Sequence, residues 1–460
     1  MNIKVINGTI VTPTDNYCAD IGIENGKVTE ISKKISSTAK EVIDAKDSYV
    51  FPGGIDIHTH LDMPFMGSFS SDDFETGTIA AAHGGTTCIV DFAIQGKGNS
   101  LKETLNEWKN KAEGKAVFDY GFHVAICDLT DEVINEIPDA VAEGVTSFKT
   151  FLAYKGALMI DDGALFRILR KSKEAGALVM IHAENGDIID IMVKELLAQN
   201  KTEPKHHAIS RPPEAEAEAT ARAINIAQMA GAPIYIVHLT CQEALEKVKS
   251  ARDRGFSALA ETCPQYLILS DKNYEEPDFN GAKYVMSPPL RDKLNHAKLW
   301  QGLSFGDLQV ISTDHCPFNF KGQKDLGRDD FSKIPNGAPG IENRLCLIFN
   351  EGVNKGRISV NRFVDLVSTM PAKLFGLYPE KGTIAVGSDA DLVVFNPKKK
   401  YTITAQSNHH NVDYTPYEGY NGKGVPEVVI SQGNVLVREG EFLGTPGKGR
   451  YIKRKKFKLP

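Results

Sequence analysis

The chain is poor in cysteine and has no long hydrophobic run. Its 7 cysteines are scattered along 460 residues, are odd in number and form no C-x-x-C pair. This pattern is untypical of a disulfide framework, so we expect a reduced, cytoplasmic protein. No apolar stretch is long enough to cross a membrane, and the first residues lack the core of a signal peptide, so we expect no membrane partner.

An excess of positive charge is also missing. The formal net charge is -6 at pH 7, which disfavours nucleic acid as a partner. The one basic stretch, Arg450 to Lys458, is interpreted as a solvated or subunit-contacting tail. A hydrophobic share of 42% and a charged share of 24% are ordinary for a globular enzyme, and the length allows one large core with a smaller satellite.

Both ends of the chain are rich in short β-like segments. Near the start these segments are separated by Asn7-Gly8 and Asn25-Gly26, and an Asn-Gly pair between apolar residues predicts a hairpin. Short β-like segments of the same kind occur near the other end. We therefore expect both ends to form one small β-sandwich that flanks a larger domain. The expected boundaries are 1–52 plus 376–445 for the discontinuous sandwich, 53–375 for the larger domain and 446–460 for a C-terminal tail at a subunit contact.

Between these ends, strand-like and helix-like stretches alternate, which is typical of βαβ units and a parallel sheet. The strand candidates lie near 54–60, 86–92, 120–126, 145–150, 177–182, 233–238, 257–262 and 309–314. Helical patterns separate them, for example at 101–112, 165–174, 214–230 and 242–252. Eight strands fit an α/β fold with a closed (β/α)8 TIM-like barrel, and an open doubly wound sheet is the alternative.

Side chains that bind metals follow several of the predicted strands. They are His58, His60, Lys149, His182, His238 and Asp314. A barrel places its chemistry at the carboxyl ends of its strands, so this shared position predicts an active site with two metals. His58 and His60 lie on one face of an extended segment and can converge on one ion, and imidazole suits zinc, iron or nickel.

Lys149 is the unusual member of this set. An ammonium group among metal ions would suffer repulsion and a desolvation cost. A neutral amine can react with carbon dioxide and become a carbamate, whose two oxygens can bridge two metals. A substrate-binding or Schiff-base lysine is the alternative. The many imidazole groups expected nearby favour the carbamate.

Several short motifs are spread along the whole chain. They are F-P-G-G-I-D-I-H-T-H (51–60), S-F-K-T-F-L-A-Y (147–154), H-A-E-N (182–185), I-V-H (236–238), E-T-C-P-Q-Y (261–266), M-S-P-P-L-R (286–291), S-T-D-H (312–315) and G-T-I-A-V-G-S-D-A-D-L-V (382–393). Together they resemble the motifs of the cyclic amidohydrolases, most closely those of the bacterial D-hydantoinases and dihydropyrimidinases. The resemblance implies a barrel with two zinc ions and a carboxylated lysine, a flanking β-sandwich and a homotetramer, with a dimer as the alternative. Manganese, cobalt or nickel can occupy similar sites.

The resemblance also implies roles for single residues. One metal would be bound by His58, His60, Lys149 and Asp314, and the other by Lys149, His182 and His238. Tyr154 matches the tyrosine that donates to the developing oxyanion. Ser287 and Asn336 match positions that hold the cyclic amide through backbone groups.

The implied reaction is hydrolytic ring opening of cyclic ureides. It converts 5-monosubstituted hydantoins to N-carbamoyl amino acids, and dihydropyrimidines to N-carbamoyl-β-amino acids. A hydroxide that bridges the metals attacks the ring carbonyl, while Asp314 acts as general base and returns the proton to the ring nitrogen. The two rings differ by one atom, which changes specificity by only about 10–200-fold in an apolar pocket, so both substrates stay open.

Several relatives of this group are alternatives. Allantoinases and dihydroorotases share the ligands, but a dihydroorotase usually carries an arginine soon after the second histidine. Here Met63 and Phe65 follow His60 and predict an apolar wall. Phe151 and Leu152 are expected to extend this wall, with core packing almost equally favoured for Leu152. Mononuclear deaminases lack the bridging lysine, and the non-enzymatic scaffold relatives have lost metal ligands.

The remaining histidines are given other roles. The pairs His206-His207 and His409-His410 lie in polar surroundings and are predicted to be at the surface. His83 is predicted to be structural. His315 is expected either to position Asp314 or to pack in the core.

Overall fold

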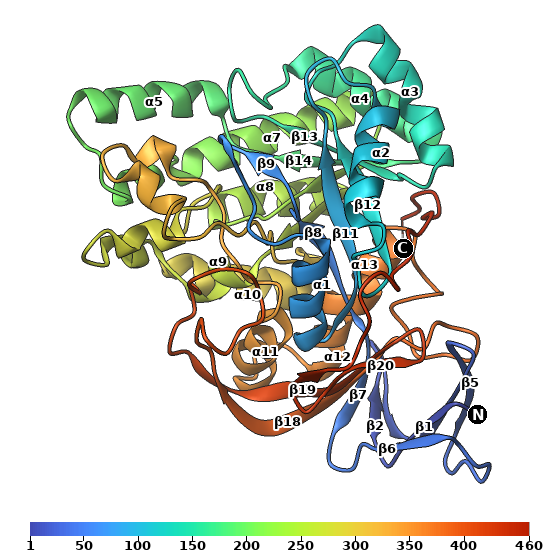
Figure 1. The fold of residues 1–460 in the computed structure, drawn as a ribbon. Coiled ribbons are helices and arrows are strands. Elements are labelled where there is room, and N and C mark those ends of the chain that lie inside the picture. Colours follow the sequence, from blue (N-terminus) through green and yellow to red (C-terminus); the bar gives the residue numbers. More distant parts are fainter. Residues whose placement is uncertain (460) are drawn as a thin grey trace.

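An eight-stranded parallel sheet forms the centre of the molecule (Figure 1), in a computed structural model that describes residues 1–459. The strands follow one another around the sheet in chain order, and each neighbouring pair is parallel. They are β8 (Gly54–Thr59), β11 (Thr86–Ile94), β12 (Tyr120–Ala125), β13 (Ser147–Phe151), β14 (Leu178–His182), β15 (Ile234–Ile236), β16 (Ala258–Thr262) and β17 (Val310–Ile311). This order confirms the predicted (β/α)8 barrel.

Helices occupy the connections between the barrel strands and follow the last of them. They are α1 (Phe74–His83), α2 (Leu101–Ala112), α3 (Asp131–Ala142), α4 (Asp162–Ala175), α5 (Gly186–Ala198), α6 (Lys205–Ile209), α7 (Pro213–Ala230), α8 (Gln242–Asp253), α9 (Pro264–Ile268), α10 (Leu294–Phe305), α11 (Arg344–Ile348), α12 (Val360–Val364) and α13 (Met370–Leu374). Helix α2 has the predicted bounds. Helix α4 begins three residues before the predicted start, because the carboxylate of Asp161 accepts from the backbone N–H of Ala164 and caps the helix there. Within residues 1–459, none of the helices combines the length and apolar character that crossing a membrane requires.

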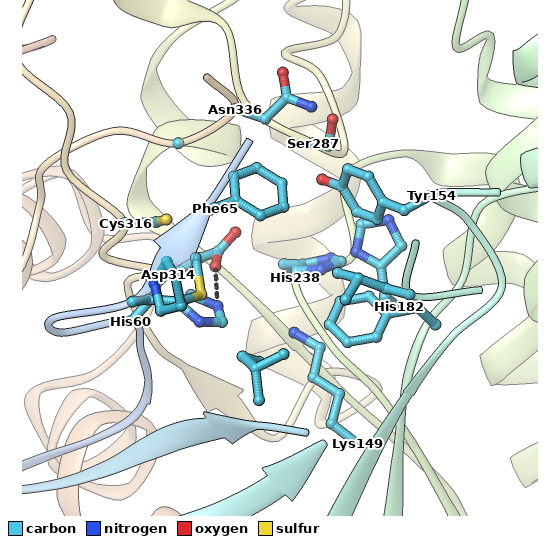
Figure 2. Close-up of a pocket in the computed structure, with 16 residues that line it drawn as sticks. His60, Phe65, Lys149, Tyr154, His182, His238, Ser287, Asp314, Cys316 and Asn336 are labelled. Atoms are coloured by element: carbon cyan, nitrogen blue, oxygen red, sulfur yellow. Dashed lines mark ion pairs between the residues drawn. The ribbon is translucent and has the colours of Figure 1, made fainter. Parts of the chain in front are cut away.

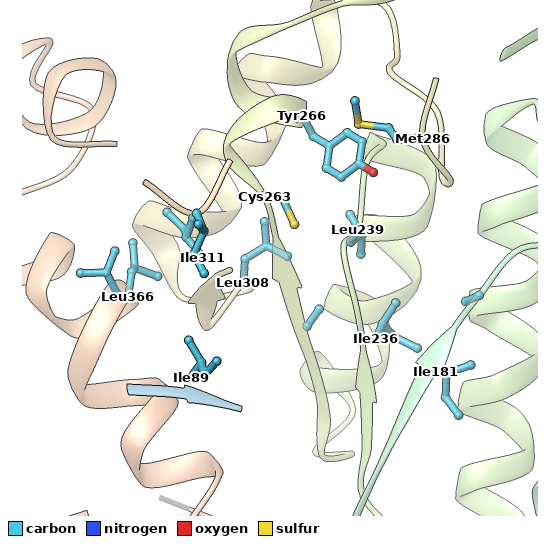
Figure 3. Close-up of a cluster of buried hydrophobic side chains, with 14 of the residues drawn as sticks. Ile89, Ile181, Ile236, Leu239, Cys263, Tyr266, Met286, Leu308, Ile311 and Leu366 are labelled. Carbon is cyan, nitrogen blue, oxygen red and sulfur yellow. The ribbon is translucent and has the colours of Figure 1, made fainter. Parts of the chain in front are cut away.

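Alternate residues of the barrel strands pack into two different cores, because successive side chains of a strand point to opposite faces. Ile181 and Ile236 belong to the outer core between strands and helices (Figure 3). Their neighbours Met180 and Tyr235 belong to a separate inner cluster. The barrel interior is therefore a packed core, and space for a ligand is left at the strand ends.

Side chains join the first barrel strand to the last. The hydroxyl of Thr313 donates to Asp56 at 2.6 Å. The guanidinium of Arg344, from the start of α11, donates to the carbonyls of Ile55 (2.8 Å) and Ile311 (3.0 Å). All of these side chains are buried. They close the barrel between β8 and β17.

Strands from both ends of the chain share one seven-stranded sheet, in the order β21-β20-β19-β18-β7-β2-β3. A four-stranded sheet, in the order β5-β4-β1-β6, accompanies it. The strands are β1 (Ile3–Ile6), β2 (Thr9–Val11), β3 (Asn16–Cys18), β4 (Asp20–Glu24), β5 (Lys27–Ser32), β6 (Glu41–Asp44), β7 (Tyr49–Pro52), β18 (Leu392–Thr402), β19 (Asn421–Ser431), β20 (Asn434–Arg438) and β21 (Glu441–Phe442). The N-terminal strand β7 pairs with the C-terminal strand β18. The domain boundaries themselves stay a prediction.

Of the two predicted hairpins, one is present. Asn25 and Gly26 both have positive φ and join β4 to β5. The prediction at Asn7-Gly8 is wrong, because β1 pairs with β4 and β6 whereas β2 pairs with β3 and β7. The chain passes between sheets at Gly8, where a Cβ atom would lie 2.5 Å from the side chain of Val50.

A buried lysine links the end sheets to the barrel. The ammonium of Lys381 lies 2.6 Å from Asp391, 3.0 Å from Asp389 and 3.0 Å from Asp119, the residue before β12. These aspartates hold the pKa of Lys381 well above its usual value in spite of burial, which alone would lower it. Asp389 and Asp391 belong to the motif at 382–393, so this part of the motif helps to join the end sheets to the barrel.

The basic C-terminal segment runs along the amino-terminal ends of the barrel strands. Tyr451 bridges to Tyr120 at the start of β12. Arg454 is buried, and its guanidinium donates to the hydroxyl of Ser147 at 2.9 Å and to the carbonyl of Phe122 at 2.5 Å. The expectation of a solvated tail is therefore wrong at Arg454, while the subunit contact stays a prediction.

We expect Arg344→Met to lower the free energy of unfolding by about 2–5 kcal/mol. The change leaves the buried carbonyls of Ile55 and Ile311 without this donor, and each unpaired group costs about 1–3 kcal/mol. Urea unfolding followed by circular dichroism measures the loss. Arg170→Met, on the exposed face of α4, is the matched control and should change stability by less than about 0.5 kcal/mol. Equal effects of the two changes would contradict a role of Arg344 in barrel closure.

Candidate active site

The six predicted metal-binding side chains meet at the carboxyl ends of the barrel strands. Figure 2 shows Lys149 pointing up between His60 and Asp314 on one side and His182 on the other. The residues come from β8, β13 and β14 and from the segments that follow β8, β15 and β17. Asp314 is partly exposed, and the other five are buried. The barrel thus brings together residues that are up to 256 positions apart, since His58 and Asp314 are the first and last of them.

Three of these side chains form a possible metal-binding group. The donor atoms of His58, His238 and Asp314 all lie within 4.8 Å of one another. Asp314 Oδ1 is 3.1 Å from His58 Nε2 and 3.3 Å from His60 Nε2. The amine of Lys149 lies 3.0 Å from His58 Nε2. Imidazole nitrogens around a carboxylate oxygen are a donor set that fits a divalent transition metal.

The remaining predicted ligand lies next to this group. The rings of His182 and His238 are 4.6 Å apart between centroids. His182 comes from β14 and His238 from the end of β15, and these strands are neighbours. Together with Lys149 they form a second set of donors, on the other side of the lysine from His60 (Figure 2).

Two buried carboxylates orient the histidines. Glu261, in β16, accepts from His58 Nδ1 and also from the hydroxyl of Tyr235 at 2.9 Å. Glu184 accepts from His182 Nε2 at 2.8 Å. A histidine that donates one ring N–H to a carboxylate keeps its other nitrogen for a metal. This leaves Nε2 of His58 and Nδ1 of His182 as the atoms that could bind a metal.

Sequence reasoning missed the role of Glu261 and Glu184, although both lie in motifs that carried the resemblance. A signal was present, because each acid lies at or just after the carboxyl end of a strand, as the ligands do. The signal is weak on its own, since an acid at a strand end can equally bind metal or substrate.

Burial sets the charge of the site. It lowers the pKa of Lys149 to about 8, although Asp314 and Glu261 oppose this change. Burial also lowers the pKa of His60 to about 4 and that of His238 well below its usual value. Burial alone would raise the pKa of Asp314, but His58 and His60 hold it well below the usual range. Neutral imidazoles at His60 and His238, an ionised carboxylate and an amine that deprotonates readily are forms that bind metal. At His58, in contrast, Asp314 and Glu261 raise the pKa in spite of burial and Lys149.

Three site residues have left-handed backbone conformations. The φ angles are 63° at Tyr154, 38° at His238 and 53° at Asp314. Such angles are uncommon for residues other than glycine and are kept where the surrounding structure enforces them, typically at functional sites. Each of the three lies within three residues of the end of a barrel strand, where the chain turns.

A cavity of about 540 Å³, including its open mouth, lies above these residues. Met63, Phe65 and Phe151 line it, as predicted, and Ile94 and Leu158 add to its apolar wall. Phe65 comes from the short hairpin of β9 (Pro64–Phe65) and β10 (Ser68–Phe69), and its ring lies edge-on to Tyr154 at 5.5 Å.

Leu152 is not part of this wall, so the prediction for it is wrong. Its side chain is 0% exposed and belongs to the outer core between strands and helices. Phe151 and Leu152 are neighbours in the chain at the end of β13, and neighbouring side chains point to opposite faces. Since Phe151 faces the cavity, Leu152 faces the helices.

Tyr154, Ser287 and Asn336 form the wall opposite Lys149 (Figure 2). Burial raises the pKa of Tyr154, an effect that Glu184 increases and that Ser287 and Asn336 oppose. The Tyr154 hydroxyl therefore stays protonated at neutral pH and can donate a hydrogen bond. The structure brings these three of the predicted substrate-binding residues to one side of the cavity.

Predictions for the other histidines are confirmed in part. His409 is exposed, and His83 has a structural place in α1, where its ring stacks on that of His409 at 3.4 Å. His206, His207 and His410 are buried, so the prediction of surface positions is wrong for them. Their polar neighbours in the sequence suggested exposure, but each is covered by segments distant along the chain.

His315 holds the ligand segments in place. Its ring contacts the buried carboxylate of Asp72 at 3.0 Å. Its backbone accepts from the N–H of His60 at 2.9 Å and donates to the carbonyl of His58 at 3.3 Å. The residue next to Asp314 thus fixes the spacing between the first and last ligand segments.

Comparisons with known proteins identify the family. The model of the amidohydrolase family matches residues 49–436. The chain belongs to this family. It is 54% identical over 458 residues to a D-hydantoinase of Geobacillus stearothermophilus, covering 99% of this chain and 97% of that protein. It is 51% identical to a D-hydantoinase of Ralstonia pickettii, with 100% of both chains covered.

Solved structures agree with this result. The crystal structure of a dihydropyrimidinase from Brevibacillus agri NCHU1002 has a TM-score of 0.99 at 53% identity, and each chain is covered to 100%. An L-hydantoinase (dihydropyrimidinase) from Arthrobacter aurescens has a TM-score of 0.91 at 30% identity, with 98% of this chain and 100% of that chain covered. The resemblance inferred from the motifs is confirmed.

We expect Glu261→Gln to weaken metal binding by about 10–100-fold, because a carboxylate that orients a ligand histidine raises its basicity. Metal retained during titration with a chelator measures the change. Glu243→Gln, an exposed position in α8, is the control and should bind metal as the parent does. Unchanged affinity in Glu261→Gln would show that His58 is oriented without this carboxylate.

Proposed function

We propose that this chain opens the ring of cyclic ureides by hydrolysis, at a centre of two divalent metal ions. The comparisons confirm an enzyme that hydrolyses C–N bonds in cyclic amides. The observation that carries the proposal is the cavity itself, in which His60, His238 and Asp314 face the hydrogen-bonding wall of Tyr154, Ser287 and Asn336. The proposed products are N-carbamoyl amino acids from 5-monosubstituted hydantoins and N-carbamoyl-β-amino acids from dihydropyrimidines.

Two sets of donors around Lys149 support two metal ions, for which we propose zinc, with manganese, cobalt or nickel as alternatives. His58, His60 and Asp314 would hold one ion, and His182 and His238 the other. When bound, the ions supply an acidified water and an electrophile for the ring carbonyl. Lys149, carboxylated by carbon dioxide, would contribute to both sets. The pKa of about 8 that burial gives Lys149 supports this, because only the neutral amine reacts with carbon dioxide.

Two residues around the cavity carry out the remaining steps. Asp314 uses Oδ1 for its contacts with His58 and His60, which leaves Oδ2 to take a proton from the attacking water. The Tyr154 hydroxyl donates to the carbonyl oxygen as negative charge develops on it. Asp314 then gives its proton to the ring nitrogen, the ring C–N bond breaks, and the open-chain carboxylate leaves.

The apolar wall supports a neutral ring with an apolar substituent. Met63, Phe65 and Phe151 can cover such a group, and among the described residues that line the cavity the only lysine or arginine is Lys149. A substrate carboxylate such as that of dihydroorotate would find no free cation here once Lys149 is carboxylated. We therefore favour hydantoins and dihydropyrimidines over dihydroorotate and allantoin.

We propose a homotetramer in the cytoplasm, with a dimer as the alternative and a small molecule as the substrate. Helix α5 exposes apolar side chains, with Ile188 47% and Ile191 52% exposed, which supports contact between copies of the chain. Light scattering of the purified protein tests the assembly, and a monomer would contradict it.

Ring opening of four substrates by the zinc-reconstituted protein tests the function. We expect hydrolysis of a hydantoin with an apolar C5 group and of dihydrouracil, and little of dihydroorotate or allantoin. Activity on dihydroorotate or allantoin alone would mean that the segment after His60 has been misinterpreted. No activity on any of the four with two metals bound would favour a relation to the non-enzymatic scaffold proteins.

We expect Lys149→Ala to lose both bound metal and turnover. Asp314→Asn should lose turnover by at least about 10²-fold while keeping part of the metal, because general acid–base catalysis contributes about 10²–10⁴-fold. Metal analysis and initial rates measure both effects. Lys155→Ala, an exposed lysine nearby, is the control. Two metals and the parent rate in Lys149→Ala would contradict the carbamate, and parent turnover in Asp314→Asn would contradict its role as base.

A further inference from the structure

A second buried lysine lies behind the substrate wall. Lys324, at the start of the 3₁₀ helix η3 (Lys324–Gly327), is 0% exposed. Its amine donates to the carbonyl of Val285 at 2.8 Å and to that of Pro335 at 2.9 Å. Among residues 1–459, no carboxylate lies within ion-pair distance of it, and burial lowers its pKa to about 7. The costly burial of a lysine is thus compensated by two backbone carbonyls and no counter-ion.

The two carbonyls belong to the segments that carry Ser287 and Asn336. Val285 lies two residues before Ser287, and Pro335 immediately precedes Asn336. The segments also meet directly, since the N–H of Gly337 donates to the carbonyl of Val285 at 3.0 Å. Asn336 is therefore held on both sides. Lys324 binds the carbonyl of the residue before it, and the carbonyl of Val285 binds the N–H of the residue after it.

Close packing fixes the second segment against the metal-binding strand end. A Cβ atom at Gly337 would lie 2.2 Å from the carbonyl oxygen of Cys316, two residues after Asp314. The segment that carries Asn336 thus packs closely against the segment that follows Asp314, and Lys324 links it to the segment that carries Ser287. These contacts define the distance between the segment that carries Ser287 and the segment that carries Asn336.

Another buried base holds the next carbonyl. His207 donates from Nε2 to the carbonyl of Met286 at 2.8 Å, and its Nδ1 accepts from Arg211 at 3.2 Å. The carbonyls of residues 285 and 286 are thus both occupied by buried basic side chains immediately before Ser287. Without these donors the carbonyl of Met286 would lose its partner in a dry interior, and that of Val285 would keep the N–H of Gly337 alone.

We infer that Lys324 is a positioning residue for the substrate, which sets the distance between the backbone of Ser287 and that of Asn336 and thereby the affinity for the cyclic ring. This inference rests on the proposed function, in which both segments hold the ring amide. Figure 2 shows Ser287 and Asn336 side by side above the Tyr154 ring, on segments that come from different parts of the chain. Lys324 acts from behind this wall, since it is not among the residues that line the cavity.

Steady-state kinetics of Lys324→Met with a C5-substituted hydantoin tests this role. Methionine fills a similar volume but donates no hydrogen bond, so both carbonyls lose a partner. The segments that carry Ser287 and Asn336 are then expected to move apart. Contacts made equally to ground state and transition state affect KM and leave kcat unchanged. We expect KM to rise by at least about tenfold, kcat to stay within about threefold and the metal content to stay at the parent value.

Lys333→Met is the matched control. Its side chain is 71% exposed, lies nine residues along the chain and pairs only with Asp330, at 3.5 Å. Its KM should equal that of the parent. An unchanged KM in Lys324→Met, or a fall in kcat with KM unchanged, would overturn the inference.

A third variant covers the case in which Lys324→Met does not fold. Lys324→Gln keeps donors on a shorter side chain, and we expect a smaller rise in KM with the same kcat. If neither variant folds, Lys324 is structural and the inference is wrong. The parent enzyme is measured in the same series, so a parent that opens no cyclic ureide contradicts the proposed function and this inference with it, whereas an active parent with an unaffected Lys324→Met contradicts the inference alone.

Discussion

The contact between the first and last barrel strands connects the two halves of the site. β8 leads to His58 and His60, and β17 leads to Asp314, so the ligand atoms approach within about 3 Å only if these strands lie side by side. Two side chains, Asp56 and Arg344, tie the strands together from inside the protein. The cavity, the donor sets and the apolar wall are all built above this closed ring. If the contact between β8 and β17 were lost, the ligand residues would therefore move apart although none of them had been changed.

Around the site, charged and polar groups are buried with partners that satisfy their hydrogen bonds. Glu261 and Glu184 accept from ligand histidines, and Lys324 and His207 donate to backbone carbonyls. Unpaired burial of such groups would cost several kcal/mol each, so their presence indicates that fixed orientation is needed there. The same chemistry serves both sides of the cavity. Carboxylates orient the side chains proposed to bind metal, and bases orient the backbone proposed to bind the ring.

Much of the fold and site could be predicted because both follow from short-range patterns. Apolar runs that end in His182, His238 or Asp314 identify strand ends, and the barrel rule places strand ends together. What could not be predicted depends on contacts between distant segments. The burial of His207 depends on the segment around residue 286, which lies far along the chain. No hairpin forms at Asn7-Gly8, because the strand that follows pairs with β7, which itself pairs with β18. Leu152 shows a further limit, because a shift of one residue in a strand exchanges cavity and core.

The pairing of both chain ends has a consequence for synthesis on the ribosome. β7 is made early, yet its partner β18 is made only after more than three hundred further residues, and the amino-terminal ends of β12 and β13 stay open until Arg454 emerges. A nascent chain therefore carries all six proposed metal ligands while its sheet edge is still unpaired. Such edges invite association with other chains, so the interval before release is when this protein is most exposed to misassembly.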